Sequence, residues 1–236
     1  MNKIKVIYQD ENVLVIDKPS GVVVFSDDEE KTIMTLLLEE FPELKKVGED
    51  PRYGMVHRLD RDTTGILLIA KNDQSLSFLQ KQFKERKVVK KYIALVVGHV
   101  KQEKGTIKTL IGRSPKDRTK QKAFSLFELK TGRREAITEY KVLKYFSKGS
   151  KKYTLLEVRI KTGRKHQIRV HLTHIGCPIV GDKIYKFRKQ SDKLERQFLH
   201  AGFLKIDLLD GQEKEFVSDL PEDLNSYLQT LNEYFE

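Results

Sequence analysis

Cysteine is almost absent from this chain: Cys177 is its only one. A single cysteine excludes an intrachain disulfide, and it leaves a thiolate metal cluster without a second sulfur ligand. Cys177 as a nucleophile is one interpretation, and buried packing is the one we favour, because a free cysteine most often serves as a small apolar side chain.

Long hydrophobic runs are missing too. The longest, residues 65–70 and 93–97, are far shorter than the roughly 20 residues that a membrane-spanning helix needs. The first ten residues alternate apolar and polar side chains and lack the hydrophobic region of a signal peptide. We therefore expect a cytoplasmic protein that does not bind membranes. Since no internal repeat or Pro/Ser-rich linker interrupts the chain, residues 1–236 are predicted to form a single domain.

Positive charge is abundant. The chain has 45 Lys and Arg against 34 Asp and Glu, a net charge of +11. Such an excess attracts polyanions, which include RNA, DNA and acidic membrane surfaces. The segment 112–122 concentrates basic residues among turn formers and is predicted to be a mobile loop. Contact with RNA and simple solvation of the surface both fit this loop at this stage.

Hydrophobic periodicity predicts an α+β fold: a mixed, mainly antiparallel central sheet flanked by helices. Helices are expected from Thr32 through Phe41, over Asn72–Lys87, over Arg164–Ile175 and over Leu224–Tyr234, and Thr32 and Asn72 are predicted to cap the first two of them. Strands are expected over Val13–Ile16, Val22–Phe25, Tyr92–Val97, Gly105–Ile111, Ala136–Phe146 and Tyr153–Ile160.

The first stretch that suggests chemistry reads HRLDRDTTG over residues 57–65 and leads into an apolar strand. A carboxylate at the entrance of a buried strand needs a partner, which makes Asp60 a candidate functional group. A surface turn capped by Asp and Thr is the alternative. A metal site shared by Asp60 and Asp62 is disfavoured, because the six histidines and the other carboxylates supply no further ligands at matching spacing.

The second stretch reads GRKHQIRVH over residues 163–171. His166 and Arg169 are three residues apart and share one face of the expected helix. A basic surface helix is one interpretation. The apolar residues between the charges indicate instead that part of this helix is buried, and a buried Arg169 needs a carboxylate, for which Asp60 is the natural candidate.

Together the two stretches resemble the signatures of the RluA/RsuA-type RNA pseudouridine synthases. Further blocks in the family's order extend the resemblance from Tyr8 to Asp207: residues 91–96, 135–140, 178–182 with Tyr185, and 199–201. The resemblance implies the pseudouridine synthase catalytic fold and an isomerase that converts uridine to pseudouridine in structured RNA, either rRNA or tRNA. It implies no cofactor and no metal.

The resemblance also assigns roles. Asp60 matches the catalytic aspartate, Tyr92 the active-site tyrosine, and Arg169 the arginine that pairs with the aspartate and lowers its pKa. Arg58 matches the arginine that enters the RNA as the uridine leaves the stack. His57 and His166 are expected to donate structural hydrogen bonds or to contact phosphate, rather than to act as general acids. Our predicted RNA contacts are therefore Arg58, His57, Arg164, His166, Arg113 and Arg118.

Many relatives carry a small RNA-binding module, the S4 module, ahead of the catalytic domain, and here the catalytic strands begin almost at once. We therefore expect a monomer that recognises a compact stem-loop through its own basic loops, 112–122 and 183–196. A protein that binds or folds RNA without catalysis is the main alternative, and the presence of Asp60, Tyr92 and Arg169 argues against it. A metal-dependent nuclease ranks last because the motifs offer too few carboxylates.

Overall fold

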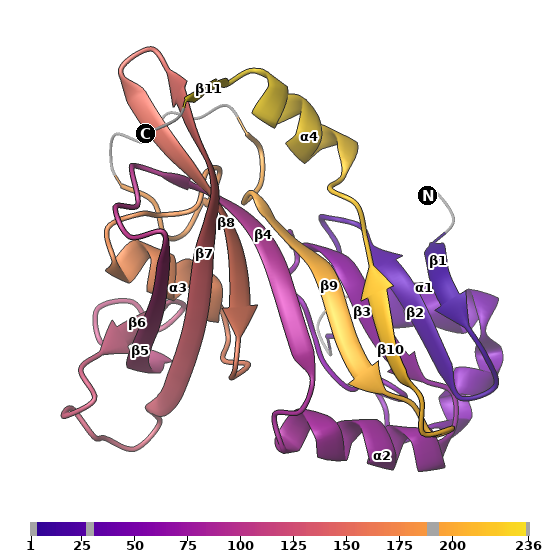
Figure 1. The fold of residues 1–236 in the computed structure, drawn as a ribbon. Coiled ribbons are helices and arrows are strands. Elements are labelled where there is room, and N and C mark those ends of the chain that lie inside the picture. The colour runs from indigo at the N-terminus through magenta and orange to yellow at the C-terminus, as the bar shows by residue number, and fades with distance from the viewer. Residues whose placement is uncertain (1–3, 27–30, 188–193, 235–236) are drawn as a thin grey trace. The chain divides into compact units, whose positions relative to one another are not determined.

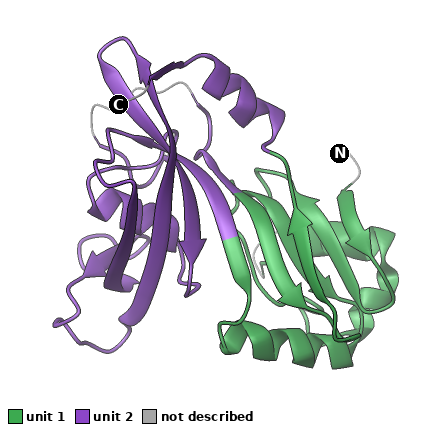
Figure 2. Cartoon of the chain, viewed as in Figure 1, with its two compact units in different colours: residues 1–90, 201–219 green, residues 91–200, 220–236 purple. Residues whose placement is uncertain are grey.

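The computed structural model describes residues 4–26, 31–187 and 194–234, and Figure 1 shows the order of their helices and strands. The chain forms two compact units (Figure 2). Unit 1 comprises residues 1–90 and 201–219, and unit 2 comprises residues 91–200 and 220–236. The expectation of a single domain over residues 1–236 stays a prediction.

Unit 1 is built on five strands in the spatial order β1, β2, β3, β9, β10. Their bounds are β1 Lys5–Gln9, β2 Val13–Lys18, β3 Thr64–Ala70, β9 Leu199–Asp207 and β10 Glu213–Val217. All seven residues of β3 are buried, as expected of a central strand with both faces covered. Strands β2, β3 and β9, together with α2 (Asp73–Lys84), supply the core of this unit.

Side chains define where the helices of unit 1 begin. Thr32 and Thr35 form a capping box at the start of α1 (Ile33–Glu40), in which each side chain hydrogen-bonds the backbone N–H of the other residue. The side chain of Asn72 caps α2 in the same way, by accepting from Ser75 N–H at 2.8 Å. A short 3₁₀ helix, η1, spans Pro42–Lys46. The predicted N-caps of both α-helices are confirmed.

The predicted strand over Val22–Phe25 is wrong. This segment forms no strand, although its β-branched residues favour one. The carbonyls of Val23 and Val24 instead accept hydrogen bonds from Ile33 and Met34, at 2.8 and 3.0 Å. They satisfy N–H groups at the start of α1 that have no partner within the helix, and this use of the backbone competes with a sheet ladder.

Unit 2 contains the strands β4, β8, β7, β5 and β6 in that spatial order, and β11 pairs with β7. Their bounds are β4 Val89–Val97, β5 Lys104–Arg113, β6 Gln121–Phe124, β7 Arg134–Lys148, β8 Lys151–Ile160 and β11 Asn232–Tyr234. The registered pairs within this unit are antiparallel, and all four strands predicted here are present. The prediction of an α+β fold is confirmed.

Two helices of unit 2 are shorter than predicted. Helix α3 spans Gln167–His174, because His166 takes the left-handed conformation with φ of 57° and ends the preceding loop. Helix α4 spans Glu222–Gln229. The residues after it, Asn232–Tyr234, form strand β11 on the edge of β7 instead of continuing the helix to Tyr234.

No helix in the described part of the chain is long and apolar enough to cross a membrane. The predicted basic loop over 112–122 is shorter in the structure: residues 112–113 and 121–122 pair with each other in β5 and β6, and only residues 114–120 form the hairpin connection. The other predicted loop, 183–196, is described only over residues 183–187 and 194–196, and residues 188–193 lie outside the described structure.

Candidate active site

Asp60 lies in a tight turn that precedes β3. Its backbone carbonyl accepts a hydrogen bond from Thr63 N–H at 3.1 Å, and the preceding Leu59 is buried, so that the turn is fixed at both ends. Asp60 itself is partly exposed. A carboxylate in this position is held in place by its backbone while it stays accessible to a ligand.

Lys18, the last residue of β2, is hydrogen-bonded to the backbone of this turn. Its side chain is fully buried, and its Nζ donates to three backbone carbonyls: Pro19 at 2.7 Å, Val22 at 2.7 Å and Arg61 at 2.8 Å. A buried ammonium is costly unless its donors are satisfied, and here all three donors have acceptors. Sequence reasoning does not single out this residue, because its acceptors are backbone carbonyls. The available signal was a lysine at the end of a buried strand.

Gly65 allows β3 to approach β9 closely. Its φ is +113°, and a Cβ placed on it would lie 2.3 Å from the carbonyl oxygen of Ala201. A side chain at this position therefore collides with the neighbouring backbone, and the conformation itself disfavours residues other than glycine. This explains a glycine at the end of the HRLDRDTTG stretch.

His57 is fixed inside unit 1. Its Nε2 accepts a hydrogen bond from Leu68 N–H at 2.9 Å, and its ring stacks on Phe83 with the centroids 5.0 Å apart. Burial, together with the nearby charge of Lys90, lowers the pKa of His57 to about 3. The neutral ring can accept this bond at physiological pH, which supports the structural interpretation of His57. Its predicted contact with RNA stays a prediction.

Arg58 is exposed beside an aromatic ring. Its guanidinium lies 5.2 Å from the centroid of Phe25, and the guanidinium of Arg52 lies at the same distance from this ring. Such cation–π contacts at an exposed site hold an arginine only weakly. Arg58 is thus positioned yet free to exchange Phe25 for another planar group.

Arg169, on α3, is buried and pairs with a carboxylate that the sequence did not indicate. Its Nε and Nη2 donate to the two oxygens of Asp182 at 2.7 and 2.9 Å. Burial alone raises the pKa of Asp182, and the hydrogen bonds and charge of Arg169, with N–H donors from Ile184 and Tyr185, bring it below its usual value. The pairing of Arg169 with Asp60 stays a prediction.

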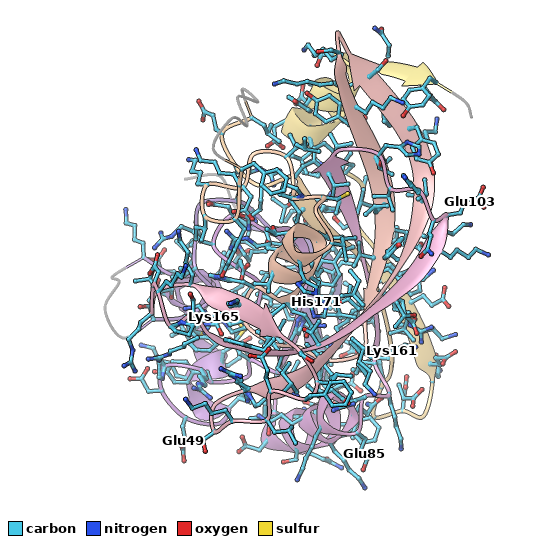
Figure 3. All side chains as sticks on the ribbon, turned by 90° about the vertical axis from the view of Figure 1, so that its left-hand side faces the viewer. Glu49, Glu85, Glu103, Lys161, Lys165 and His171 are labelled. Atoms are coloured by element: carbon cyan, nitrogen blue, oxygen red, sulfur yellow. The ribbon has the colours of Figure 1, made fainter. Side chains whose placement is uncertain are left out.

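Gln167 anchors the start of α3 to the sheet of unit 2. Its Oε1 accepts from Thr162 Oγ1 and from Arg164 N–H, and its Nε2 donates to the carbonyl of Ile137. Further along the helix is His171, which is labelled in Figure 3 and fully buried. Its ring nitrogens lie 2.9 and 2.8 Å from the hydroxyls of Thr109 and Thr138. Burial lowers the pKa of His171 to about 4. Residues 167–171 of the second motif are thus buried and hydrogen-bonded to the sheet of unit 2.

His166 and Arg164 lie just before α3, in the loop that leads into the helix. The Nδ1 atom of His166 is 2.9 Å from the hydroxyl of Tyr185, which also accepts from Gln121 N–H. Arg164 Nε donates to the carbonyl of Glu135 at 2.9 Å. Both predicted RNA-contacting residues are therefore held by bonds within unit 2 while remaining partly exposed.

Tyr92 lies on β4 in register with Val158 of β8, and only 7% of it is exposed. The structure divides the predicted site residues between the two units. Unit 1 holds His57, Arg58 and Asp60, and unit 2 holds Tyr92, Arg113, Arg118, Arg164, His166 and Arg169. Arg113 and Arg118 are exposed at the β5–β6 hairpin.

The described residues contain no group of three or more His, Cys, Asp or Glu side chains placed to hold a metal ion. Cys177 is buried, and burial raises the pKa of its thiol, which agrees with packing rather than nucleophilic chemistry.

A surface pocket of about 540 Å³ lies elsewhere in unit 2, and none of the predicted site residues lines it. Its lining residues are Lys91, Lys104, Gly105, Thr106, Glu139, Tyr140, Lys141, Glu157 and Arg159.

Comparison with known proteins gives the class. The family model described as RNA pseudouridylate synthase matches residues 12–174, a segment that contains both motifs, and the chain belongs to this family. The fold agrees: human RNA pseudouridylate synthase domain containing 1 superposes with a TM-score of 0.80 at 27% identity, covering 98% of this chain and 89% of that one. Human RNA pseudouridylate synthase domain containing 4 superposes with a TM-score of 0.75 at 28% identity, covering 97% of this chain and 94% of that one.

Curated relatives narrow the family to its RluA type. An uncharacterized RNA pseudouridine synthase of Chloroflexus aurantiacus is 42% identical over 92% of this chain and 66% of its own length. One from Aquifex aeolicus is 43% identical over 80% of this chain and 58% of its own length. The ribosomal large subunit pseudouridine synthase D of Pseudomonas aeruginosa is 37% identical over 98% of this chain and 72% of its own length. The chain thus spans about three fifths of the first two of these proteins.

Proposed function

We propose that this chain is an RNA pseudouridine synthase, an isomerase that converts uridine to pseudouridine in structured RNA. The observation that carries the proposal is the family match over residues 12–174, which includes Asp60, Tyr92 and Arg169. Relatives named as ribosomal large subunit enzymes favour rRNA over tRNA as the substrate. The proposed location is the cytoplasm and the proposed state a monomer.

The reaction sets clear demands. The bond from C1′ to N1 of uridine breaks, the uracil turns, and a bond from C1′ to C5 forms, after which C5 loses its proton and N1 carries one. The step is redox-neutral and adds no group, so that no redox cofactor or group donor enters its balance, and we propose that it uses no cofactor. The protein must stabilise an electron-poor sugar and hold the detached base, and an ionised carboxylate serves the sugar, as it does in glycosidases.

Asp60 is proposed to supply that carboxylate. Its turn is fixed by the hydrogen bond from Thr63 and by the bond of Lys18 to Arg61. A reacting group must be held close to its productive position, since small displacements cost large factors in rate. Lys18 acts in this proposal as a positioning residue that works through the backbone next to Asp60.

Tyr92 is proposed to contact the uracil, and Arg169 is proposed to stabilise the negative charge of the catalytic carboxylate. Tyr92 offers a ring that stacks on the uracil, and its hydroxyl is a candidate to receive the C5 proton, although its reference pKa of about 10 requires assistance. Arg169 uses Nε and Nη2 on Asp182. The resemblance assigns Asp60 to Arg169 as a further carboxylate partner, and a guanidinium, which has five N–H donors, can bind more than one carboxylate.

The target uridine must leave its stack, because its reactive bonds are inaccessible within it. Unstacking costs a few kcal/mol, which an inserted side chain offsets. Arg58 is proposed to enter the vacated space, since its present cation–π contact with the Phe25 ring is weak and a nucleobase can replace it.

The proposal is tested by tritium release from transcripts labelled at C5 of uridine, with large-subunit rRNA and tRNA assayed side by side. Wild type is expected to release tritium from one of them. Asp60→Asn should release none while binding the same RNA within about tenfold of wild type. Asp62→Asn, a neighbouring carboxylate outside the proposed chemistry, is the matched control and should retain activity. Release by Asp60→Asn at the wild-type rate, or none by wild type on either RNA, overturns the proposal.

A further inference from the structure

The surface pocket of unit 2 lies over the neighbouring strands β4, β8, β7 and β5 (Figure 1). Six charged side chains line it, and they form two rows of cross-strand partners. The first row is Lys91, Arg159 and Glu139, and the second is Glu157, Lys141 and Lys104. Since the rows are two residues apart along the strands, all six side chains point to the same face of the sheet. Four cations against two carboxylates give this lining a net charge of +2.

Two of the cations lie directly opposite each other. Lys104 of β5 and Lys141 of β7 are registered partners, and both are exposed. Like charges in opposite positions of an antiparallel pair are destabilising. An anion bound between the two lysines would remove this repulsion.

Both carboxylates of the pocket already have a lysine partner. Glu157 lies 3.3 Å from Nζ of Lys91, and Glu139 lies 3.3 Å from Nζ of Lys161, which is outside the pocket lining. Within the described part of the chain, Lys104 and Lys141 form no such ion pair. The positive charge that the pocket offers to a ligand is therefore the charge of these two lysines.

Arg159 adds a hydrogen-bond donor without an acceptor. Its Nε atom is buried and has no hydrogen-bond partner among the described residues. Oε2 of Glu139 lies 4.0 Å from it, beyond hydrogen-bond distance. Buried donors in folded proteins are nearly always satisfied, and leaving one unsatisfied is costly. The repulsion between two lysines and the unsatisfied donor thus occur in one pocket, and an anion relieves both.

We propose that this pocket binds a small phosphate-bearing anion, either inorganic phosphate or a phosphomonoester, through Lys104, Lys141 and Arg159. A phosphate dianion matches the net charge of the lining, and its tetrahedral oxygens accept hydrogen bonds from donors on several strands. The pocket volume of about 540 Å³ lies within the range of small-molecule sites, so that a phosphate ester also fits.

The proposed anion site is separate from the residue proposed to contact the uracil. Lys91 lines the pocket, and Tyr92 follows it on β4. Successive side chains of a strand point to opposite faces, so that Tyr92 points away from the pocket. An anion bound here does not occupy the position of a uracil at Tyr92, and its binding is expected to be independent of RNA.

The test is isothermal titration calorimetry of the whole chain with inorganic phosphate and with ribose 5-phosphate, at constant ionic strength. At least one of them is expected to bind with a Kd below about 10 mM. Lys141→Gln and Arg159→Gln should each weaken this binding about fivefold or more. Lys108→Gln is the matched control and should bind as wild type does. Lys108 lies on the same strand and face as Lys104, outside the pocket, and 3.4 Å from Glu135.

Thermal unfolding gives an independent measurement. Without phosphate and at low salt, Lys141→Gln should have a higher Tm than wild type, because its repulsion with Lys104 is gone. Phosphate should raise the Tm of wild type and of Lys108→Gln, and it should raise the Tm of Lys141→Gln less, because a ligand stabilises only a protein that binds it.

The outcomes decide both the site and the source of the phosphate. Tighter binding of ribose 5-phosphate assigns the pocket to an ester, and tighter or equal binding of inorganic phosphate assigns it to the free ion. A Kd above about 10 mM for both probes overturns the inference, and so do equal losses for Lys141→Gln and Lys108→Gln. Displacement of phosphate from wild type by an RNA hairpin also overturns it, because the pocket is then part of an RNA-binding surface. None of these results depends on tritium release.

Discussion

The Nζ atom of Lys18 donates a hydrogen bond of 2.8 Å to the carbonyl of Arg61, the residue that follows Asp60. The same ammonium binds the carbonyls of Pro19 and Val22. One buried side chain thus joins the end of β2 to the turn that carries the proposed catalytic carboxylate. Its removal affects both the stability of the fold and the position of that turn.

Lys18→Met is expected to lower the free energy of unfolding by about 3 kcal/mol or more, because three carbonyls lose a charged donor in a buried position. Urea denaturation monitored by circular dichroism measures this change. Lys5→Met is the matched control: Lys5 is 69% exposed in its ion pair with Asp17, and its loss should cost less than about 1 kcal/mol. An unchanged urea midpoint for Lys18→Met contradicts the role given to this residue.

Asp182→Asn should destabilise the protein by roughly 3 kcal/mol at pH 7, since it leaves the buried Arg169 without its counter-charge. The folded pKa of Asp182 lies below its unfolded value of 3.8, so that its ionised form contributes stability above that value and loses it as pH falls through the folded pKa.

Urea midpoints of Asp182→Asn measured from pH 7 to pH 3 should therefore fall less steeply below pH 4 than those of wild type. Asp219→Asn, at an exposed position, serves as the control and should follow the wild-type curve. Parallel curves for Asp182→Asn and wild type below pH 4 count against the assigned linkage.

His57 should remain neutral through the physiological range, because its pKa is lowered to about 3 by burial and by Lys90. The unfolded chain takes up a proton near pH 6.5 and the folded chain does not, so that this histidine favours unfolding as pH falls from 6.5 toward 3. Nitrogen-15 NMR of the histidine rings, assigned with His57→Gln, should show no titration of His57 between pH 8 and pH 5. A titration midpoint near 6.5 contradicts the buried hydrogen bond to Leu68.

Arg58→Ala should reduce kcat/KM on the substrate RNA at least about tenfold without a measurable change in stability, because the residue is exposed and its proposed partner is the RNA. Arg52→Ala is a close control, since the guanidiniums of Arg52 and Arg58 both lie 5.2 Å from the Phe25 ring. Equal losses for the two variants assign the effect to Phe25 and remove the role proposed for Arg58.

The sequence predicts those parts of the fold that depend on local patterns. Thr32 and Asn72 cap their helices as expected, because N-capping is decided within four residues. The segment Val22–Phe25 has strand propensity and forms none, because its carbonyls bind the start of α1. Local propensity carries no information about which distant backbone groups compete for a segment.

The site likewise has features that the local sequence predicts and features that depend on distant residues. The motif around Asp60 indicates a functional carboxylate, and the charge of Arg169 indicates a buried partner. That partner includes Asp182, which lies 13 residues away and comes within reach only through the loop after α3. The three carbonyl acceptors of Lys18 are also invisible in a sequence, since a backbone oxygen is the same at every residue. Tertiary hydrogen bonds to the main chain are therefore the part of the site that the structure alone supplies.

Unit 1 is assembled from two stretches that are far apart in the chain, residues 1–90 and 201–219. Its core includes Leu204, Ile206 and Phe216 from the second stretch. During synthesis on the ribosome, the first ninety residues emerge without the strands that complete their sheet, and these arrive only after all of residues 91–200. The core residues of the first stretch must wait, with apolar surface uncovered, until the second stretch has been translated, and this interval is where a chaperone has most to protect.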